Sequence, residues 1–359
     1  MKKVLTVFGT RPEAIKLFPL ILKLREETSL EHKICVTGQH KEMLDSVLSE
    51  FDITPDYNLS VMKESQTLSY LTESILVKIN AVLDEYTPDI ILVHGDTTTA
   101  FTSALAAFYR GIRVGHVEAG LRSNDIFAPF PEEFNRRAIS LISSYNFAPT
   151  KESVDNLLRE GIKKENIYLT GNTAIDTIKH TLKSNVCFDL PHKPFVLMTL
   201  HRREHTDAEI SEIFGAVRKI CIEFANLTVI YPVHKNPRFT LLSKNILGDL
   251  PNVILTDPIN VKKFHSLLNE CLFIMTDSGG IQEEASFLGK HVLILRNNTE
   301  RPEGITCGNL KVIGTDHERV FNEMKNLIIK AEAPSQLARC DKFGDGRASE
   351  RIVEILKSI

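Results

Sequence analysis

Residues 275 to 290, MTDSGGIQEEASFLGK, have the pattern of a buried strand, a tight glycine turn and the start of a helix. With Ser278 as N-cap, Gly279 and Gly280 expose the first free backbone N–H groups, where the helix dipole also favours an anion. Glu284 follows Gly280 by about one turn, ~6 Å along the same helix face. That distance is roughly the one between the phosphate and the ribose of a nucleotide. The stretch therefore predicts a diphosphate at the glycines and a ribose at Glu284.

Carboxylates occur at three other points near the end of an apolar run. Asp96 follows DIILVHG, Glu118 ends RVGHVE, and Glu132 lies in APFPEEFNRR. Asp96 could instead cap the helix that begins at residues 97–99, and Glu132 could pair with Arg136 at the i,i+4 spacing of a helix. Glu118 has no helix N-terminus directly after it, so its burial favours a functional role. Several carboxylates that face a sugar would indicate proton transfer at carbon.

The stretch TLHRREHTDAEI places His201 and Arg202 directly after another apolar run. His201 to His205 fit the H-x-x-E-H zinc signature, but that chemistry needs both histidines on one face of a helix. Here the motif follows a strand, and the helix is expected to begin later, with Thr206 or Asp207 as its cap. We therefore expect no metal, and we expect His201 and Arg202 to donate to a substrate or a phosphate.

Two more polar groups are candidates for substrate binding. His234 ends the run YPVH, where a hydrogen-bonded structural histidine is the alternative. The stretch LRNNTERPEGIT gathers Arg296, Glu300 and Arg301 around a proline turn, where a surface cluster of ion pairs is the alternative.

The elements that would position these residues are short apolar runs that alternate with amphipathic stretches. The first half contains KVLTVF, KICVT, DIILVHG, RVGHVE and YNFAPT, and the second half contains FVLMTL, LTVIYPV, NVILTD, LFIMTD and KHVLIL. Such runs are typical of parallel sheets covered on both faces, which bind ligands beyond the carboxyl ends of their strands. The residues that follow these runs include Arg11, Asp96, Glu118, His201, His234, Asp277 and Ser278.

Two series of strands, in a chain of 359 residues, predict two domains. We expect an α/β fold with two doubly wound, Rossmann-like parallel sheets, over residues 1–170 and 171–345, that face each other across a cleft. The first domain would carry the carboxylates and the second the nucleotide site. GRASERIVEILKSI predicts a terminal helix over 346–359. No G-x-G-x-x-G follows the first strand, which disfavours an NAD dehydrogenase.

Composition narrows the class of protein. Apolar content of 43%, charged content of 25% and a net charge of −3 are typical of a soluble globular protein and disfavour a nucleic-acid surface. Apolar runs stay short of the ~20 residues of a membrane span. The six cysteines contain no CxxC pair. They predict buried thiols in a reducing, cytoplasmic compartment, with neither a disulfide framework nor a zinc site.

The motifs taken together resemble one family. The chain contains, in order, VFGTRPEAIKLFPL, GQHKEMLD, HGDTTTA, HVEAGLRS, PFPEEFNRR, GN, HRRE, YPVHKNP, SGGIQEE and RNNTERPE. This series, over residues 4 to about 304, is similar to that of the non-hydrolysing UDP-N-acetylglucosamine 2-epimerases. The resemblance implies a fold like that of GT-B glycosyltransferases, a C-terminal helix that rejoins the first domain, and a homodimer.

The resemblance also implies a reaction. The family inverts C2 of UDP-N-acetylglucosamine to give UDP-N-acetylmannosamine, without metal or nicotinamide, through elimination of UDP to a glycal and readdition. The product would feed surface polysaccharide, such as capsule. By matching motif positions, Asp96, Glu118 and Glu132 resemble the acid/base carboxylates, and His201 resembles a residue that is catalytic or stabilises the leaving group. The matching positions for binding phosphates and sugar are Arg11, Lys16, Arg136, Ser278 and Gly279, with Glu284 for the ribose, Phe264 for the uracil, and Arg301 as a further active-site arginine.

Three positions depart from the family pattern. His205 stands where many members have the Asn of HRREN. Ser65 and Glu42 stand where some members use an arginine and a glutamine to bind a second, activating UDP-N-acetylglucosamine. Loss of a cation and gain of an anion beside a diphosphate predict weak or absent activation. Two other enzymes fit the same motifs: a GT-B glycosyltransferase, and a hydrolysing epimerase that releases N-acetylmannosamine and UDP. A non-catalytic nucleotide-sugar sensor is the alternative from another class.

Overall fold

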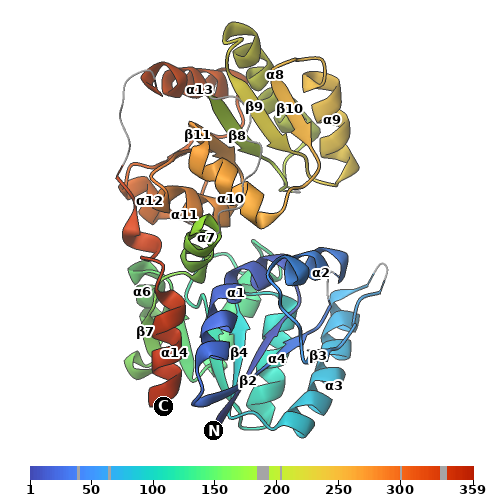
Figure 1. The fold of residues 1–359 in the computed structure, drawn as a ribbon, viewed down its shortest axis with the longest axis vertical. Coiled ribbons are helices and arrows are strands. Elements are labelled where there is room, and N and C mark those ends of the chain that lie inside the picture. Colours follow the sequence, from blue (N-terminus) through green and yellow to red (C-terminus); the bar gives the residue numbers. More distant parts are fainter. Residues whose placement is uncertain (39–40, 64–65, 184–193, 203, 300, 332–337) are drawn as a thin grey trace. The chain divides into compact units, whose positions relative to one another are not determined.

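The structure is a computed structural model that describes residues 1–38, 41–63, 66–183, 194–202, 204–299, 301–331 and 338–359. The chain forms two compact units (Figure 1). Unit 1 contains Met1–His180 and Phe343–Ile359, and unit 2 contains Thr181–Lys342. No helix in the described part of the chain combines the length and the apolar content that a membrane crossing requires.

Unit 1 is built on a parallel sheet that has, within the described residues, seven strands in the order β3-β2-β1-β4-β5-β6-β7. The strands are β1 Lys2–Phe8, β2 Leu30–Val36, β3 Tyr57–Asn58, β4 Ile90–His94, β5 Arg113–Val117, β6 Tyr145–Ala148 and β7 Ile167–Leu169. The central strand β4 is buried along its whole length, because helices cover both faces of the sheet.

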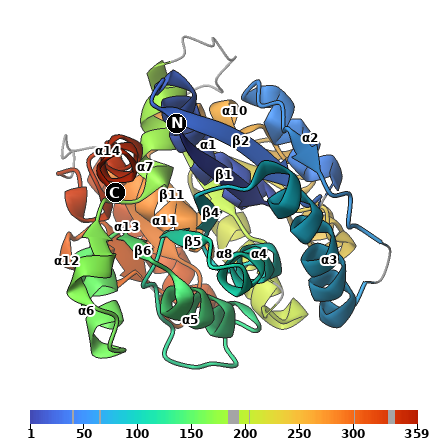
Figure 2. The ribbon, with the colours of Figure 1, turned by 90° about the horizontal axis from the view of Figure 1, so that it is seen from below.

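Helices alternate with these strands. They are α1 Arg11–Glu26, α2 Lys41–Glu50, α3 Leu68–Tyr86, α4 Thr98–Tyr109, α5 Glu132–Ile142, α6 Lys151–Arg159, α7 Thr173–Lys183 and, from the end of the chain, α14 Ala348–Ser358. Helix α14 packs against α1, and α7 also lies beside it (Figure 2). Its start is held by Asp176 of α7, whose carboxylate accepts the backbone N–H groups of Ala348 at 3.1 Å and Ser349 at 2.8 Å. A carboxylate at a helix N-terminus satisfies donors that the helix leaves unpaired.

Unit 2 repeats this architecture with a parallel sheet of six strands, among the described residues, in the order β10-β9-β8-β11-β12-β13. The strands are β8 Phe195–Thr199, β9 Thr228–Pro232, β10 Val253–Thr256, β11 Phe273–Thr276, β12 His291–Ile294 and β13 Leu310–Val312. The helices are α8 Asp207–Glu223, α9 Pro237–Leu247, α10 Val261–Glu270, α11 Gly279–Phe287, α12 Pro302–Thr306 and α13 His317–Ala331. The α/β class with two doubly wound sheets is confirmed.

Each apolar run named above contains a strand, whereas β3, β7 and β13 were not predicted. These three strands lie at sheet edges and have two or three residues each. Runs this short carry no periodicity, so a sequence cannot distinguish them from loops. The expected start of α8 is confirmed, because Thr206 is its N-cap and forms a capping box with Glu209.

The cysteine prediction is wrong for one pair. Cys307, at the end of α12, and Cys340 form a disulfide across a sequence separation of 33 residues, with 5.8 Å between their Cα atoms. The backbone N–H of Cys340 donates to the carbonyl of Ser286 at 3.0 Å, which brings the returning chain beside α11. Sequence spacing could not show this contact, because it depends on where the segment after α13 returns. Cys35, Cys221 and Cys271 are free and buried.

Reduction of this disulfide should destabilise unit 2. Closure of a loop of 33 residues corresponds to about 3–4 kcal/mol of lost unfolded-state entropy. We therefore expect urea unfolding of unit 2 to move to lower concentration with reductant. The double variant Cys307→Ser/Cys340→Ser should not respond to reductant. Alkylation of both cysteines in protein kept free of reductant would contradict the pairing.

Candidate functional site

The carboxylate of Glu118 lies in a buried cluster directly after β5. Lys16 of α1 places Nζ 2.8 Å from Glu118 Oε1, and Nε2 of His94, the last residue of β4, lies 3.1 Å from Oε2. Glu118 is 8% exposed and has φ of 66°, a backbone region that residues with a Cβ seldom adopt. Unusual backbone at a buried carboxylate is a feature of functional sites. A cation and an imidazole thus flank one candidate acid or base.

Asp96 does not cap α4. The N-cap is Thr97, whose hydroxyl accepts the N–H of Ala100 at 3.0 Å. The carboxylate of Asp96 instead forms an ion pair with Arg136 of α5, and its backbone carbonyl accepts the amide of Asn135 at 2.9 Å. The capping alternative for Asp96 is therefore wrong.

The start of α5 carries the acidic first turn that the structural alternative describes. Arg136 is directed at Asp96 and, at 3.5 Å, at Glu133. An i,i+4 ion pair of α5 joins Glu133 to Arg137 at 2.9 Å. Glu132 is the first residue of α5, at the other end of the loop that begins after Glu118.

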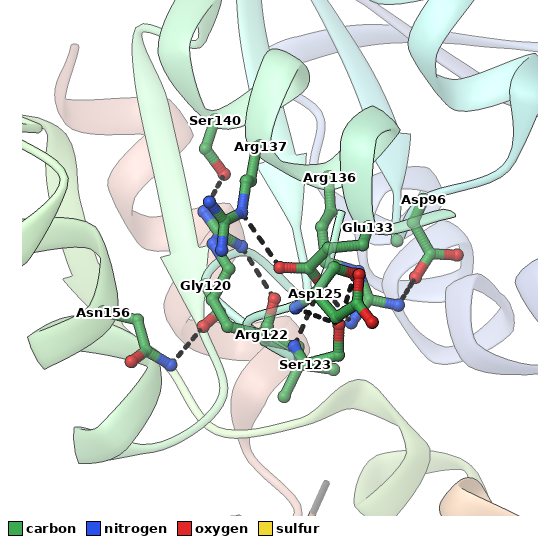
Figure 3. A network of polar contacts seen from close by, with 12 residues as sticks. Asp96, Gly120, Arg122, Ser123, Asp125, Glu133, Arg136, Arg137, Ser140 and Asn156 are labelled. Atoms are coloured by element: carbon green, nitrogen blue, oxygen red, sulfur yellow. Dashed lines mark hydrogen bonds and ion pairs between the residues drawn. The ribbon is translucent and has the colours of Figure 1, made fainter. Parts of the chain in front are cut away.

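The loop between β5 and α5 is braced by buried polar contacts (Figure 3). Glu133, which is fully buried, accepts the backbone N–H of Ser123 at 3.0 Å. The guanidinium of Arg122 donates to both carboxylate oxygens of Glu160, at 2.8 and 2.7 Å. Charge-assisted and bidentate bonds are among the stronger contacts of a protein. They hold in place the loop that separates two of the candidate carboxylates.

Sequence reasoning missed two residues of this site, His94 and Glu13. Glu13, 2% exposed, accepts the N–H groups of Gly9 at 3.0 Å and Thr10 at 2.8 Å and the hydroxyl of Thr97 at 2.7 Å. Burial raises the pKa of Glu13, although these hydrogen bonds oppose the shift. The T-x-x-E capping pattern could have indicated Glu13. His94 belongs to an apolar strand, and no motif in the sequence indicated it.

Two histidines, His116, which is buried, and His32, which is partly buried, should make unit 1 sensitive to mild acid. Nε2 of His116 donates to the carbonyl of Gly95 at 2.7 Å, and Nε2 of His32 lies 2.9 Å from the hydroxyl of Thr6. Burial lowers the pKa of His116 to about 3 and that of His32 to about 4, from 6.5. Between these values and 6.5 the unfolded chain binds more protons, so stability falls as pH falls.

From about pH 7 to about pH 5 we expect each histidine to remove about 2 kcal/mol from the free energy of unfolding. Urea titrations at both pH values measure this loss. The variant His32→Gln/His116→Gln should show a smaller difference between the two titrations. An equal difference in that variant and in the wild type would contradict the assignment.

In unit 2 the glycine turn begins α11 with Ser278 as N-cap, as predicted. A Cβ placed on Gly279 would lie 3.4 Å from Nη2 of Arg301, whereas one on Gly280 would meet nothing within 4 Å. The guanidinium of Arg301 therefore lies beside the first N–H groups of the helix. Backbone donors, the helix dipole and an arginine together suit a phosphate.

The two glutamates of α11 have different surroundings. Glu283, 1% exposed, pairs with Nε of Arg301 and so holds the guanidinium beside the glycines. Glu284, 8% exposed, lies 3.6 Å from Nε2 of His265, whose ring neighbours that of Phe264 with 6.3 Å between centroids. Glu284 therefore contacts α10 at the residue that follows Phe264.

The surface-cluster alternative around the proline turn is wrong for the two arginines. Arg296 and Arg301 are each 8% exposed, and Arg296 lies 3.2 Å from Glu204. Glu300 lies outside the described residues, as do Ser65 and the side chain of Glu42.

His201 lies in the loop before α8, and its Nδ1 is 2.8 Å from Oδ1 of Asp277. Nε2 of His205 approaches the other oxygen of the same carboxylate at 3.4 Å. Both histidines of the zinc-like signature therefore precede the helix rather than share one of its faces. His234 is exposed, with its ring centroid 6.3 Å from that of His201, and its Nδ1 accepts the N–H of Asn236 at 3.1 Å.

Each unit gathers its own part of the predicted site. Unit 1 brings Lys16 to Glu118 and Arg136 to Asp96, with Arg11 at the start of α1, where burial lowers its pKa. Unit 2 brings Arg301 to the glycines and His265, the residue after Phe264, to Glu284. This arrangement offers acid/base groups in one unit and a nucleotide-like site in the other.

A family model described as UDP-N-acetylglucosamine 2-epimerase matches residues 22–357. The UDP-N-acetylglucosamine 2-epimerase of Bacillus subtilis is 46% identical over 359 residues, which cover 99% of this chain and 94% of the relative. The UDP-N-acetylglucosamine 2-epimerase of Escherichia coli K12 is 45% identical over 370 residues, which cover 99% of this chain and 98% of the relative.

Solved structures are equally similar. The S. aureus MnaA–UDP co-structure has a TM-score of 0.92 at 47% identity and covers 100% of this chain and 96% of its own. UDP-GlcNAc 2-epimerase of Neisseria meningitidis bound to UDP-GlcNAc has a TM-score of 0.92 at 41% identity, covering 99% and 100%. A glycotransferase of kitacinnamycin, at 12% identity and a TM-score of 0.65, shows likeness of fold alone. The GT-B-like fold expected from the sequence is confirmed.

Proposed function

Because this chain belongs to the UDP-N-acetylglucosamine 2-epimerase family, we propose that it interconverts UDP-N-acetylglucosamine and UDP-N-acetylmannosamine by the non-hydrolysing route. The observation that carries the proposal is the buried carboxylate of Glu118 between Lys16 and His94, beside the ion pair of Asp96 and Arg136. A glycosyltransferase would not need several carboxylates at the sugar.

The reaction must remove a proton from C2, which has no adjacent carbonyl and is poorly acidic. In the proposed step a carboxylate takes the C2 proton, the C–H electrons form the C1–C2 double bond of a glycal, and the C1–O bond breaks so that UDP leaves with its electron pair. Readdition of UDP and return of a proton to the other face of C2 complete the inversion. Because the two faces need separate groups, Asp96, Glu118 and Glu132 are the candidates.

The groups of unit 2 are suited to hold UDP. The α11 N-terminus and Arg301 would bind the diphosphate, Glu284 would accept from the ribose hydroxyls, and Phe264 would contact the uracil. His201 would stabilise the charge that develops on the departing UDP. Lys16 and Arg136, which contact the carboxylates, would also donate to the sugar, and Arg11 would contribute positive charge.

Proton NMR of the purified protein with UDP-N-acetylglucosamine in deuterated water tests this function. We expect a mixture of the two UDP-sugars, both without the C2 proton signal. Free N-acetylmannosamine with UDP would identify the hydrolysing enzyme instead. Unchanged substrate that retains its C2 proton would contradict an epimerase and favour a transferase or a sensor.

We further propose that the protein acts as a cytoplasmic homodimer whose product feeds surface polysaccharide. Light scattering that gives the mass of a monomer would contradict the dimer. Weak activation by substrate, proposed from Ser65 and Glu42, predicts a hyperbolic rate curve, and a clearly sigmoidal curve would contradict it.

A further inference from the structure

Asp277 is a fully buried carboxylate at the end of β11. Its Oδ2 accepts the backbone N–H groups of His201 and Arg202, both at 2.8 Å. Backbone donors cannot rotate away, so they fix the plane of the carboxylate. Its other oxygen, Oδ1, lies 2.8 Å from Nδ1 of His201. Asp277 thus hydrogen-bonds the main chain of His201 and lies within ion-pair distance of its ring.

The carboxylate stays charged despite its burial. Burial alone would raise the pKa of Asp277, but donors from His201, His205 and the backbone of Arg202 lower it far below its usual range. A buried negative charge beside Nδ1 favours a proton on that nitrogen and stabilises the imidazolium. The His201 side chain is 42% exposed, and its second nitrogen, Nε2, lies on the side of the ring away from Asp277.

We propose that Asp277 is a positioning residue that holds the proton of His201 on Nδ1 and favours the charged ring, whose Nε2–H then donates to the leaving diphosphate. We also propose that His205, which is 5% exposed and whose Nε2 lies 3.4 Å from Oδ2, moderates this effect as a second imidazole beside the same carboxylate. The role in catalysis rests on the proposed function. The effect of Asp277 on the His201 ring does not rest on the proposed function, because it follows from contacts within unit 2.

Other charged or titratable groups face this cluster and must be kept constant in any test. They are His234 and Tyr231 from β9 and its end, Arg202 and Glu204 in the His201 loop, Glu209 of α8, Arg238 of α9, and Arg296 after β12. Single substitutions at Asp277 and His205 leave all of them in place, so differences between these variants report on the cluster.

The first test is a ring titration by NMR on protein labelled with ¹⁵N histidine. The chain has 12 histidines, and His201→Gln identifies the signal of His201. In the wild type we expect the neutral ring to carry its proton on Nδ1. In Asp277→Asn we expect this preference to weaken and the titration midpoint of His201 to fall by about one pH unit or more. An unchanged midpoint and tautomer in Asp277→Asn would overturn the proposal.

Variants of His205 should shift the titration midpoint of His201 in the direction opposite to Asp277→Asn. They also keep the test valid if Asp277→Asn fails to fold. His205→Phe keeps a buried ring but removes the donor, so the carboxylate should act more strongly on His201 and its midpoint should rise. His205→Asn retains an N–H donor and should restore the wild-type midpoint. If His205→Phe leaves the midpoint unchanged, the moderating role of His205 is wrong.

Activity then connects the cluster to the reaction. We expect kcat to follow the His201 midpoint across pH in each variant, with KM changed much less. Wild-type protein that exchanges no C2 proton would refute the proposed function while the ring titration still tests Asp277. Exchange whose pH profile is the same in the wild type and in Asp277→Asn would overturn the catalytic part of the inference.

Discussion

Glu118→Gln is expected to lower the rate of C2 deuterium exchange by about 10³-fold, within the range of about 10²–10⁴ that general acid–base groups contribute. Glutamine keeps the shape of the side chain and can still accept from Lys16, which lies 2.8 Å from Oε1, so the fold should survive. It cannot take a proton from carbon. The measurement is loss of the C2 proton signal in deuterated water.

The control for this variant is Glu152→Gln, which removes an exposed carboxylate of α6 that pairs with Arg159. It should exchange at the wild-type rate. Calorimetry should show that Glu118→Gln still binds UDP. If Glu118→Gln kept more than about a tenth of the exchange rate, Glu118 would not be an acid or base of the reaction.

Deuterium exchange started from each of the two UDP-sugars in turn distinguishes the groups that act on the two faces of C2. If Glu118 serves one face alone, its variant should lose proton removal from one UDP-sugar more than from the other. The same comparison with Asp96→Asn and Glu132→Gln assigns the second group. Equal loss from both epimers in every variant would contradict separate groups for the two faces.

Arg301→Met is expected to weaken both UDP binding and folding. The guanidinium lies beside Gly279, and loss of a charge-assisted hydrogen bond to phosphate should reduce UDP affinity by about 10- to 100-fold. The variant also removes the ion pair between Arg301 and Glu283, which is 1% exposed. Removal of one partner of a buried pair costs about 3–5 kcal/mol of stability. Titration calorimetry with UDP and urea unfolding measure the two effects.

The double variant Arg301→Met/Glu283→Gln separates binding from folding. A neutral glutamine removes the buried charge that has lost the arginine, so stability should largely recover. UDP affinity should stay low, because the arginine is still absent. Recovery of affinity along with stability would mean that Arg301 acts on the structure of the turn and does not contact the phosphates.

Local features of the fold followed from local patterns in the chain. The apolar runs identified the longer strands, and Thr206 and Ser278 marked the helix starts, because strand periodicity and capping depend on residues within one or two turns. The ordered series of motifs likewise identified the family. The exceptions were edge strands of two or three residues, such as β3 and β13, which are too short to carry a pattern.

The partners of the charged residues were decided by the tertiary structure. Asp96 resembled a helix cap in sequence, but β4 lies beside β5 in the sheet and α5 follows β5, so Arg136 reaches it across 40 positions. Lys16 and Glu118 meet across 102 positions, and Cys307 meets Cys340 across 33. The sequence by itself determined which residues could do chemistry and where strands and helices form. Strand order and burial decided which of those residues meet, because a buried charge is stable only beside a partner that the fold brings to it.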